Sequence, residues 1–152
     1  MTVCVVGVGN DLRGDDGVGL EVARRLEGTL PADVRLLECE GEPVSLLDAW
    51  QGCDVAILVD ATVSGKEPGL VRRLLAHEAP LPPELQRAST HLLGVAEAVE
   101  LARALGRLPE RTIVYGIEGG CFDTGTALSE PVAAAVDTVA DAIRRELVET
   151  PA

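Results

Sequence analysis

A chain of 152 residues is long enough to bury one core but short for two, so we expect a single domain over 1–152. It carries 25 acidic and 13 basic side chains, and the net charge of −12 repels nucleic acid and anionic membranes, so neither is expected as a partner. It has no apolar stretch of about 20 residues and no charged-then-apolar leader. We therefore expect a soluble, cytoplasmic protein.

Apolar runs of strand type alternate with helical patterns along the chain. In chain order we predict a buried strand over 2–8, a helix over 16–28, a strand over 33–38, a short helix over 43–51, a fully buried strand over 53–61, an edge strand over 69–75, a proline-containing loop over 78–88, a helix over 92–105, a strand over 112–117 and a last helix striped by Val132, Val136, Val139, Ala140, Ile143 and Leu147. This alternation predicts an α/β fold: a single domain with a mainly parallel, twisted sheet of about five strands and helices on both faces.

The four cysteines lie far apart in the sequence, and none forms a Cys-x-x-Cys pair. Cys4, Cys39, Cys53 and Cys121 are therefore expected to be small buried hydrophobic residues in a reducing compartment. Aromatic residues make up only 2% of the chain, so the core must consist of Val, Leu, Ile and Ala, and no platform for stacking bases is expected.

Residues 7–19 form a glycine-rich segment between the first predicted strand and helix: Gly-Val-Gly-Asn-Asp-Leu-Arg-Gly-Asp-Asp-Gly-Val-Gly. A dinucleotide-binding loop needs a third glycine where this chain has Leu12, and a P-loop would end in Gly-Lys-Ser/Thr, which is absent. The segment instead brings two adjacent carboxylates, Asp15 and Asp16, to the start of a helix. This pattern indicates a site for a cation or a proton rather than for a phosphate.

Other polar side chains follow the predicted strands. Asp60 closes the strand over 53–61, His91 lies just before a helix, and Glu118 follows the last strand. Ligands of such sheets bind beyond the carboxyl ends of the strands, so Asp16, Asp60 and His91 could converge there. Two oxygens and one nitrogen suit a borderline divalent ion such as zinc or nickel and leave coordination positions open.

From the residues alone, other roles remain open. A hydrolase triad of Ser89, His91 and Asp60 is possible, although two residues so close in one loop have poor geometry for a nucleophile and its base, and there is no Gly-x-Ser-x-Gly motif. Each residue also has a structural alternative. Asp15 could be an N-cap that accepts from the amides near Gly17 or Val18, Asp16 could complement the helix dipole, and Asp60 could form an Asx turn with Thr62 or Val63. His91 could be an ordinary residue at a helix start, His77 a solvated side chain and Glu118 a surface carboxylate.

Four motifs in order point to a known family. They are the segment Gly7–Gly19, Asp60-Ala61, Ser89-Thr90-His91 and Gly116-Ile117-Glu118. With these motifs the chain resembles the maturation endopeptidases of nickel–iron hydrogenases over nearly its whole length. One departure is Gly119, where some relatives have proline, and it concerns a loop that faces the substrate.

The resemblance implies that Asp16, Asp60 and His91 are the catalytic, metal-contacting residues. It also implies a partner, the precursor of a hydrogenase large subunit, from which one endoproteolytic cut removes a C-terminal extension after nickel has been inserted. Nickel then arrives with the substrate, and zinc or cadmium could occupy the same site. We expect the protein to act on this large partner as a monomer.

Two other functions are weighed against this one. A non-catalytic, metal-sensing chaperone of the same fold would dock on the maturing subunit without cutting it. A nucleotide-binding domain would need an acidic residue after the second strand, a place where Glu38 and Glu40 lie, but Leu12 disfavours it. The endopeptidase is the function that the sequence favours.

Overall fold

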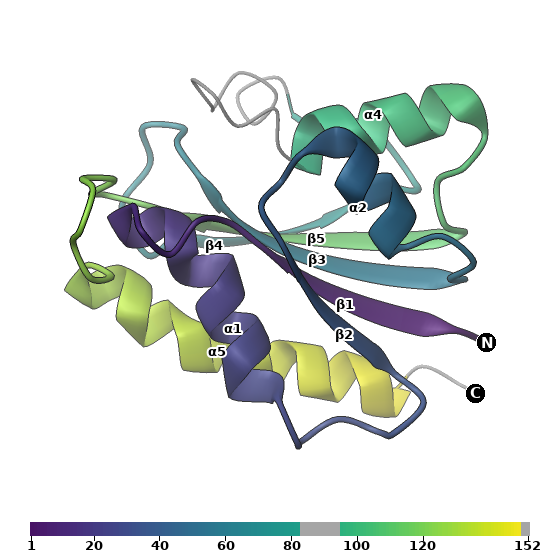
Figure 1. Ribbon diagram of the computed structural model, residues 1–152, viewed down its shortest axis with the longest axis horizontal. Helices are drawn as coiled ribbons and strands as arrows, with labels where there is room; N and C mark the ends of the chain where they lie inside the picture. Colours follow the sequence, from purple (N-terminus) through teal and green to yellow (C-terminus); the bar gives the residue numbers. More distant parts are fainter. Residues whose placement is uncertain (83–94, 150–152) are drawn as a thin grey trace.

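The computed structural model describes residues 1–82 and 95–149 of the chain (Figure 1). Within these ranges the elements are β1 (Val3–Val8), the 3-10 helix η1 (Gly14–Gly17), α1 (Val18–Leu26), β2 (Arg35–Cys39), α2 (Pro43–Ala49), β3 (Val55–Thr62), β4 (Val71–Leu75), α4 (Val95–Leu105), β5 (Arg111–Glu118) and α5 (Glu130–Glu149).

The strands form a single five-stranded sheet with the order β2-β1-β3-β5-β4. β1, β2, β3 and β5 run parallel, and β4 pairs antiparallel with β5 at one edge. The predicted α/β class, the mainly parallel sheet and the edge position of the fourth strand are therefore confirmed. Because four strands are parallel, their carboxyl ends lie together at one edge of the sheet, which we call the carboxyl edge.

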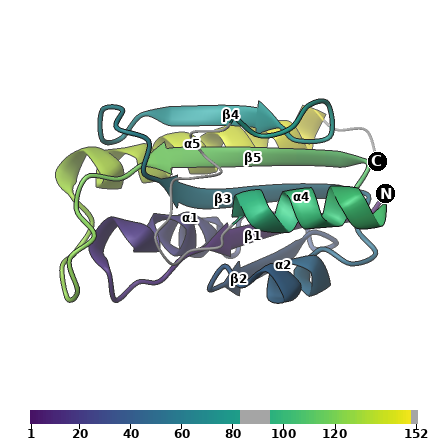
Figure 2. The ribbon, with the colours of Figure 1, turned by 90° about the horizontal axis from the view of Figure 1, so that it is seen from above.

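Helices cover both faces of the sheet, as predicted. In Figure 1, α2 and α4 lie on one face and α1 and α5 on the other, and the view from above in Figure 2 agrees. Each face has its own core of mainly aliphatic residues, with Trp50, at the end of α2, buried on the α2 and α4 face and Tyr115 buried on the α5 side. The central strands β1 and β3 are buried on both faces, which explains their continuous apolar runs. No helix among the described residues is long and apolar enough to cross a membrane.

The start of the first helix differs from its prediction. The helix expected over 16–28 begins with the separate 3-10 turn η1 and becomes α-helical only at Val18. Gly14 takes a left-handed backbone with φ of 58°, and the N–H of Asp15 donates to the Cys121 carbonyl oxygen at 2.8 Å. A contact with a distant loop thus sets this turn. Residues 83–94, which include parts of the predicted loop 78–88 and helix 92–105, lie outside the described residues.

The cysteines are all free thiols, but they are not equally buried. Cys4 and Cys53 lie in the core on the α2 and α4 face, as predicted. Cys39 and Cys121 are only half-buried, because both stand where the chain leaves the carboxyl edge of the sheet.

His77 was predicted to be a solvated side chain, and this prediction is wrong. Its ring is mostly buried, and its Nδ1 accepts a hydrogen bond of 3.0 Å from the N–H of Thr112. The imidazole therefore joins the end of β4 to the start of β5, away from the carboxyl edge.

Candidate active site

Asp16 and Asp60 come together at the carboxyl edge, as the sequence predicts. β1 and β3 are neighbours in the sheet, and η1, which carries Asp16, contacts β3, which carries Asp60. Asp16 is fully buried and Asp60 is partly buried. The two are close enough for the charge of Asp16 to act on the titration of Asp60. Two acidic side chains thus lie close together with little access to solvent.

The glycine-rich segment holds Asp16 there through backbone contacts. The N–H of Asn10 donates to the carbonyl oxygen of Asp16 at 3.1 Å, and the N–H of Asp16 donates to the carbonyl oxygen of Arg13 at 3.2 Å. Gly9, with φ of 152°, passes so close that a Cβ atom on it would lie 1.9 Å from the Asp16 carbonyl oxygen. A side chain at position 9 would therefore push η1 away from the sheet.

Asp15 faces away from this pair, and its predicted N-cap role is wrong. Its carboxylate accepts backbone hydrogen bonds from Gly120 (2.7 Å), Cys121 (3.0 Å) and Ser129 (2.7 Å), and a fourth from the Ser129 hydroxyl (2.8 Å). Burial alone raises the pKa of Asp15, but these bonds outweigh it and hold the pKa below its ordinary value. Asp15 is therefore an ionised anchor between η1 and the loop after β5.

The pKa of Asp60 is shifted in the opposite direction to that of Asp15. Burial first, and then the charge of Asp16, raise its pKa well above the ordinary value of 3.8, against hydrogen bonds from the N–H groups of Ala61 and Val95. The Ala61 N–H donates to Asp60 Oδ1 at 2.8 Å, so the predicted Asx turn with Thr62 or Val63 is replaced by a bond to the next residue. The site therefore disfavours two negative charges in the absence of a cation.

This electrostatic situation fits a divalent cation. A positive charge beside Asp16 and Asp60 would relieve both the burial of charge and the repulsion that raise the pKa of Asp60. Among the described residues no group of three or more His, Cys, Asp and Glu side chains gathers as a metal site. The third predicted ligand, His91, lies outside the described residues, as does Ser89 of the alternative triad. The ligand roles of Asp16, Asp60 and His91 therefore stay predictions.

Replacing Asp60 by asparagine should stabilise the metal-free protein at neutral pH. Because the pKa of Asp60 is higher in the folded than in the unfolded state, the stability contributed by its protonated form is complete below about pH 3.8 and is lost as the pH rises through the folded-state value. The asparagine side chain stays neutral at every pH. We expect a gain on the order of 1 kcal/mol at pH 7, or roughly 2–4 °C in Tm, which shrinks toward pH 4.

Thermal unfolding of both proteins in steps from pH 4 to pH 8 measures this difference. Asp33→Asn, at an exposed position in the connection after α1, serves as the control for the loss of one negative charge. A gain for Asp60→Asn that is the same at every pH would show that burial and repulsion of charge are not its cause.

Glu118 was left open as a site residue or a surface carboxylate, and the surface alternative is wrong. It is 2% exposed, and its carboxylate accepts bonds from the Thr62 hydroxyl (2.8 Å), the Ser64 N–H (2.8 Å) and the Ser64 hydroxyl (2.7 Å). Sequence reasoning missed these partners of Glu118, as it missed Ser129 as a partner of Asp15. The residues are far apart in the chain, and no local pattern signals the contacts.

The carboxylate that a nucleotide-binding domain would need after β2 has another partner. Arg24 of α1 donates to both oxygens of Glu38, at 3.1 and 3.3 Å, and to Asp11 in the glycine-rich segment at 3.0 Å. Leu12 lies at the surface, 67% exposed. Arg24 thus links Glu38 to the glycine-rich segment, and a Glu38 carboxylate engaged in this way does not favour a ribose.

Comparisons with known proteins point to one family. A model of the hydrogenase maturation protease family matches residues 20–146. A putative hydrogenase maturation protease of Methanocaldococcus jannaschii is 32% identical, with 95% of this chain and 96% of that protein covered. The hydrogenase expression/formation protein HupD of Rhodobacter capsulatus is 30% identical, with 93% and 70% covered. The solved hydrogenase maturating endopeptidase HybD of Escherichia coli has a TM-score of 0.83 at 28% identity, with 98% and 93% covered.

The fold and the site define an α/β protein with a pair of carboxylates, one buried and one partly buried, at the carboxyl edge of its sheet. The family model covers most of the chain, and the chain belongs to the hydrogenase maturation protease family. The chain is shorter than some relatives: the match spans 70% of the R. capsulatus protein and 53% of HupD from Thiocapsa roseopersicina.

Proposed function

We propose that this protein is the endopeptidase that removes the C-terminal extension from the nickel-loaded precursor of a nickel–iron hydrogenase large subunit. The observation that carries the proposal is the pair formed by the buried Asp16 and the partly buried Asp60, which is electrostatically suited to a cation, in a chain of the hydrogenase maturation protease family. The nickel is part of the substrate in this proposal. The protease tests whether the metal is in place before it cuts.

Asp16 and Asp60 would contact the nickel presented by the precursor, with His91 as the nitrogen ligand that the family resemblance implies. A metal held in this way supplies Lewis acidity, which polarises a carbonyl or lowers the pKa of a bound water. Asp60 has a further property: its raised pKa makes it ready to give up or take up a proton as positive charge arrives or leaves. Recognition of the metal and proton movement would thus occur at one place.

The experiment compares two forms of the precursor. The purified protein is incubated with the nickel-loaded precursor and, separately, with the metal-free precursor, and the products are weighed by mass spectrometry. We expect the C-terminal peptide to be lost only from the nickel-loaded form. Binding of the nickel-loaded precursor without any loss of mass would overturn the proposal in favour of the docking chaperone, and equal cleavage of both forms would remove the role of the metal.

A further inference from the structure

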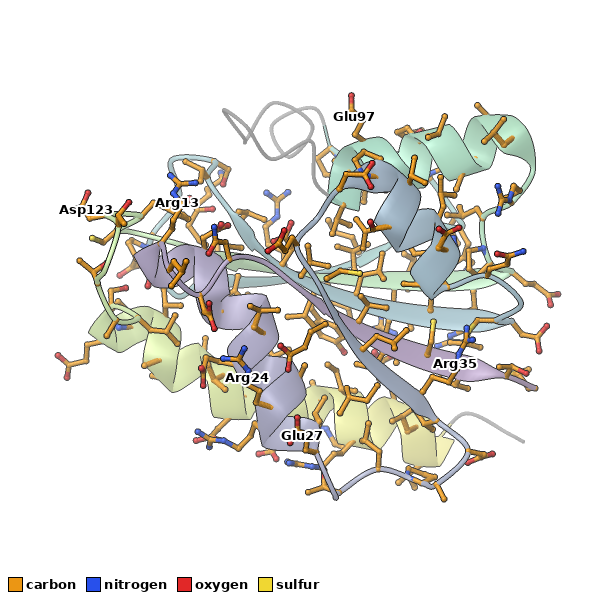
Figure 3. All side chains as sticks on the ribbon, in the orientation of Figure 1. Arg13, Arg24, Glu27, Arg35, Glu97 and Asp123 are labelled. Atoms are coloured by element: carbon orange, nitrogen blue, oxygen red, sulfur yellow. The ribbon has the colours of Figure 1, made fainter. Side chains whose placement is uncertain are left out.

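Three loops at the carboxyl edge, the edge at which Asp16 and Asp60 lie, are joined to one another by hydrogen bonds. They are the glycine-rich segment after β1, the loop 63–70 between β3 and β4, and the loop 119–129 between β5 and α5. Figure 3 shows Arg13 of the first loop and Asp123 of the third at the same end of the molecule, and Figures 1 and 2 place the loop 63–70 there too.

Four residues at the end of β5 and the start of the loop 119–129, Glu118–Cys121, bond both of the other loops. We call them the connecting segment. The Glu118 carboxylate takes three bonds from Thr62 and Ser64 at the start of the loop 63–70, and the Glu118 backbone makes two more bonds at the end of that loop. The N–H of Glu118 donates to the Leu70 carbonyl oxygen (2.9 Å), and the N–H of Gly69 donates to the Glu118 carbonyl oxygen (2.7 Å). The start and the end of the loop 63–70 are therefore both held by Glu118.

The other half of the connecting segment holds the glycine-rich segment. Gly120 and Cys121 donate their N–H groups to the Asp15 carboxylate, and the Cys121 carbonyl oxygen accepts from the Asp15 N–H. The loop 119–129 adds two bonds from Ser129 to the same carboxylate and one from the Gly125 N–H to the Leu12 carbonyl oxygen (2.8 Å). The turn that carries Asp16 is set by the backbone N–H of Asp15, a bond that a change of the Asp15 side chain leaves in place.

We propose that Asp15 and Glu118 are positioning residues: through the connecting segment they hold the three loops around Asp16 and Asp60 in the arrangement that receives the C-terminal segment of the precursor. This inference rests on the proposed function. Both carboxylates are buried and take three or more hydrogen bonds from protein groups, and those bonds occupy the oxygens that a metal would need. Their negative charges bind the donors of the loops, whereas Asp16 and Asp60 would contact the substrate.

Glu42 offers a matched control. Its carboxylate also takes three hydrogen bonds, from the N–H groups of Val44 and Ser45 and from the Ser45 hydroxyl, but all of them come from the first turn of its own helix α2. Glu42→Gln therefore removes the charge of a carboxylate with as many hydrogen bonds as Glu118, without releasing a distant loop. Asp15→Asn and Glu118→Gln each place an amide N–H₂ group where backbone and hydroxyl donors now point.

The first measurement is steady-state cleavage of the nickel-loaded precursor at a temperature at which every variant is folded. For Asp15→Asn and Glu118→Gln we expect KM to rise about 10-fold while kcat changes less than about 3-fold, because binding of the peptide is affected and the reacting groups are retained. Affinity for Zn²⁺ as a probe, measured by calorimetry, should stay within about 2-fold of the wild type, because neither residue is a ligand. Glu42→Gln should match the wild type in all three quantities.

A second measurement is independent of cleavage. Amide hydrogen exchange of Asp15→Asn should be faster in the loop 119–129 and also in the loop 63–70, which Asp15 does not bond, because the connecting segment transmits the release. If the wild-type chain cleaves no precursor, the proposed function fails, and this exchange pattern alone decides whether the connecting segment couples the loops. An unchanged KM, a loss of Zn²⁺ affinity in Asp15→Asn, or faster exchange confined to the loop 119–129 would each overturn the inference.

Discussion

Asparagine at position 16 or 60 is expected to lower the rate of cleavage of the nickel-loaded precursor at least about 100-fold, the scale on which a lost acid–base or metal-contacting group acts. Each change keeps the size of the side chain and removes its charge. Because burial of charge and the neighbouring Asp16 raise the pKa of Asp60, neither change should unfold the protein, and Asp60→Asn should even stabilise it at neutral pH. Loss of activity together with a gain in stability is typical of a residue that acts in the reaction at a cost to the stability of the fold.

The measurement is mass spectrometry of the precursor over time, with circular dichroism of each variant to confirm the fold. His91→Ala, at the third member of the trio, should lose cleavage in the same way. Asp33→Asn, which removes an exposed carboxylate far along the chain from the site, should cleave like the wild type. Cleavage at the wild-type rate by any one of the three site variants would remove that residue from the trio.

The fold could be predicted from the sequence because its main signals are local. Continuous apolar runs such as Val55–Val59 indicate strands that are buried on both faces, and the spacing of Val18, Val22 and Leu26 indicates a helix with one apolar face. The errors lie at the ends of elements. The strand expected to end at Ala61 extends to Thr62, because Thr62 pairs with Glu118 across the sheet, and pairing partners are not visible in a local pattern.

The candidate site was predictable in part, for a similar reason. The meeting of Asp16 and Asp60 follows from a topological rule, since parallel neighbouring strands bring their carboxyl ends to one edge. The sequence could not tell that the adjacent Asp15 has a different role, because its partner Ser129 lies 114 residues away. Glu118 bonds Ser64 across 54 residues, and its burial depends on that contact. Roles set by distant partners need the structure.

Alanine at position 19 is expected to destabilise the protein by about 3 kcal/mol or more, at the upper end of the cost of overpacking. Gly19 lies in α1, where alanine would normally be favoured by about 1 kcal/mol. Here α1 crosses the sheet so closely that a Cβ atom on Gly19 would lie 2.3 Å from the Val8 carbonyl oxygen and 2.4 Å from that of Val59. Both atoms belong to the backbone of β1 and β3, so the helix itself would have to move.

Thermal and urea unfolding of Gly19→Ala test this, with a fall in Tm of roughly 6–12 °C expected for a domain of this size. Gly106→Ala is the control, because Gly106 has open space around it but a φ of 68°, so alanine there should cost only about 1–2 kcal/mol of backbone strain. A Gly19→Ala protein as stable as the wild type would show that α1 can shift freely over β1 and β3. It could then not hold Asp16 in a fixed place beside Asp60, so the stability of this one variant also bears on how rigid the site is.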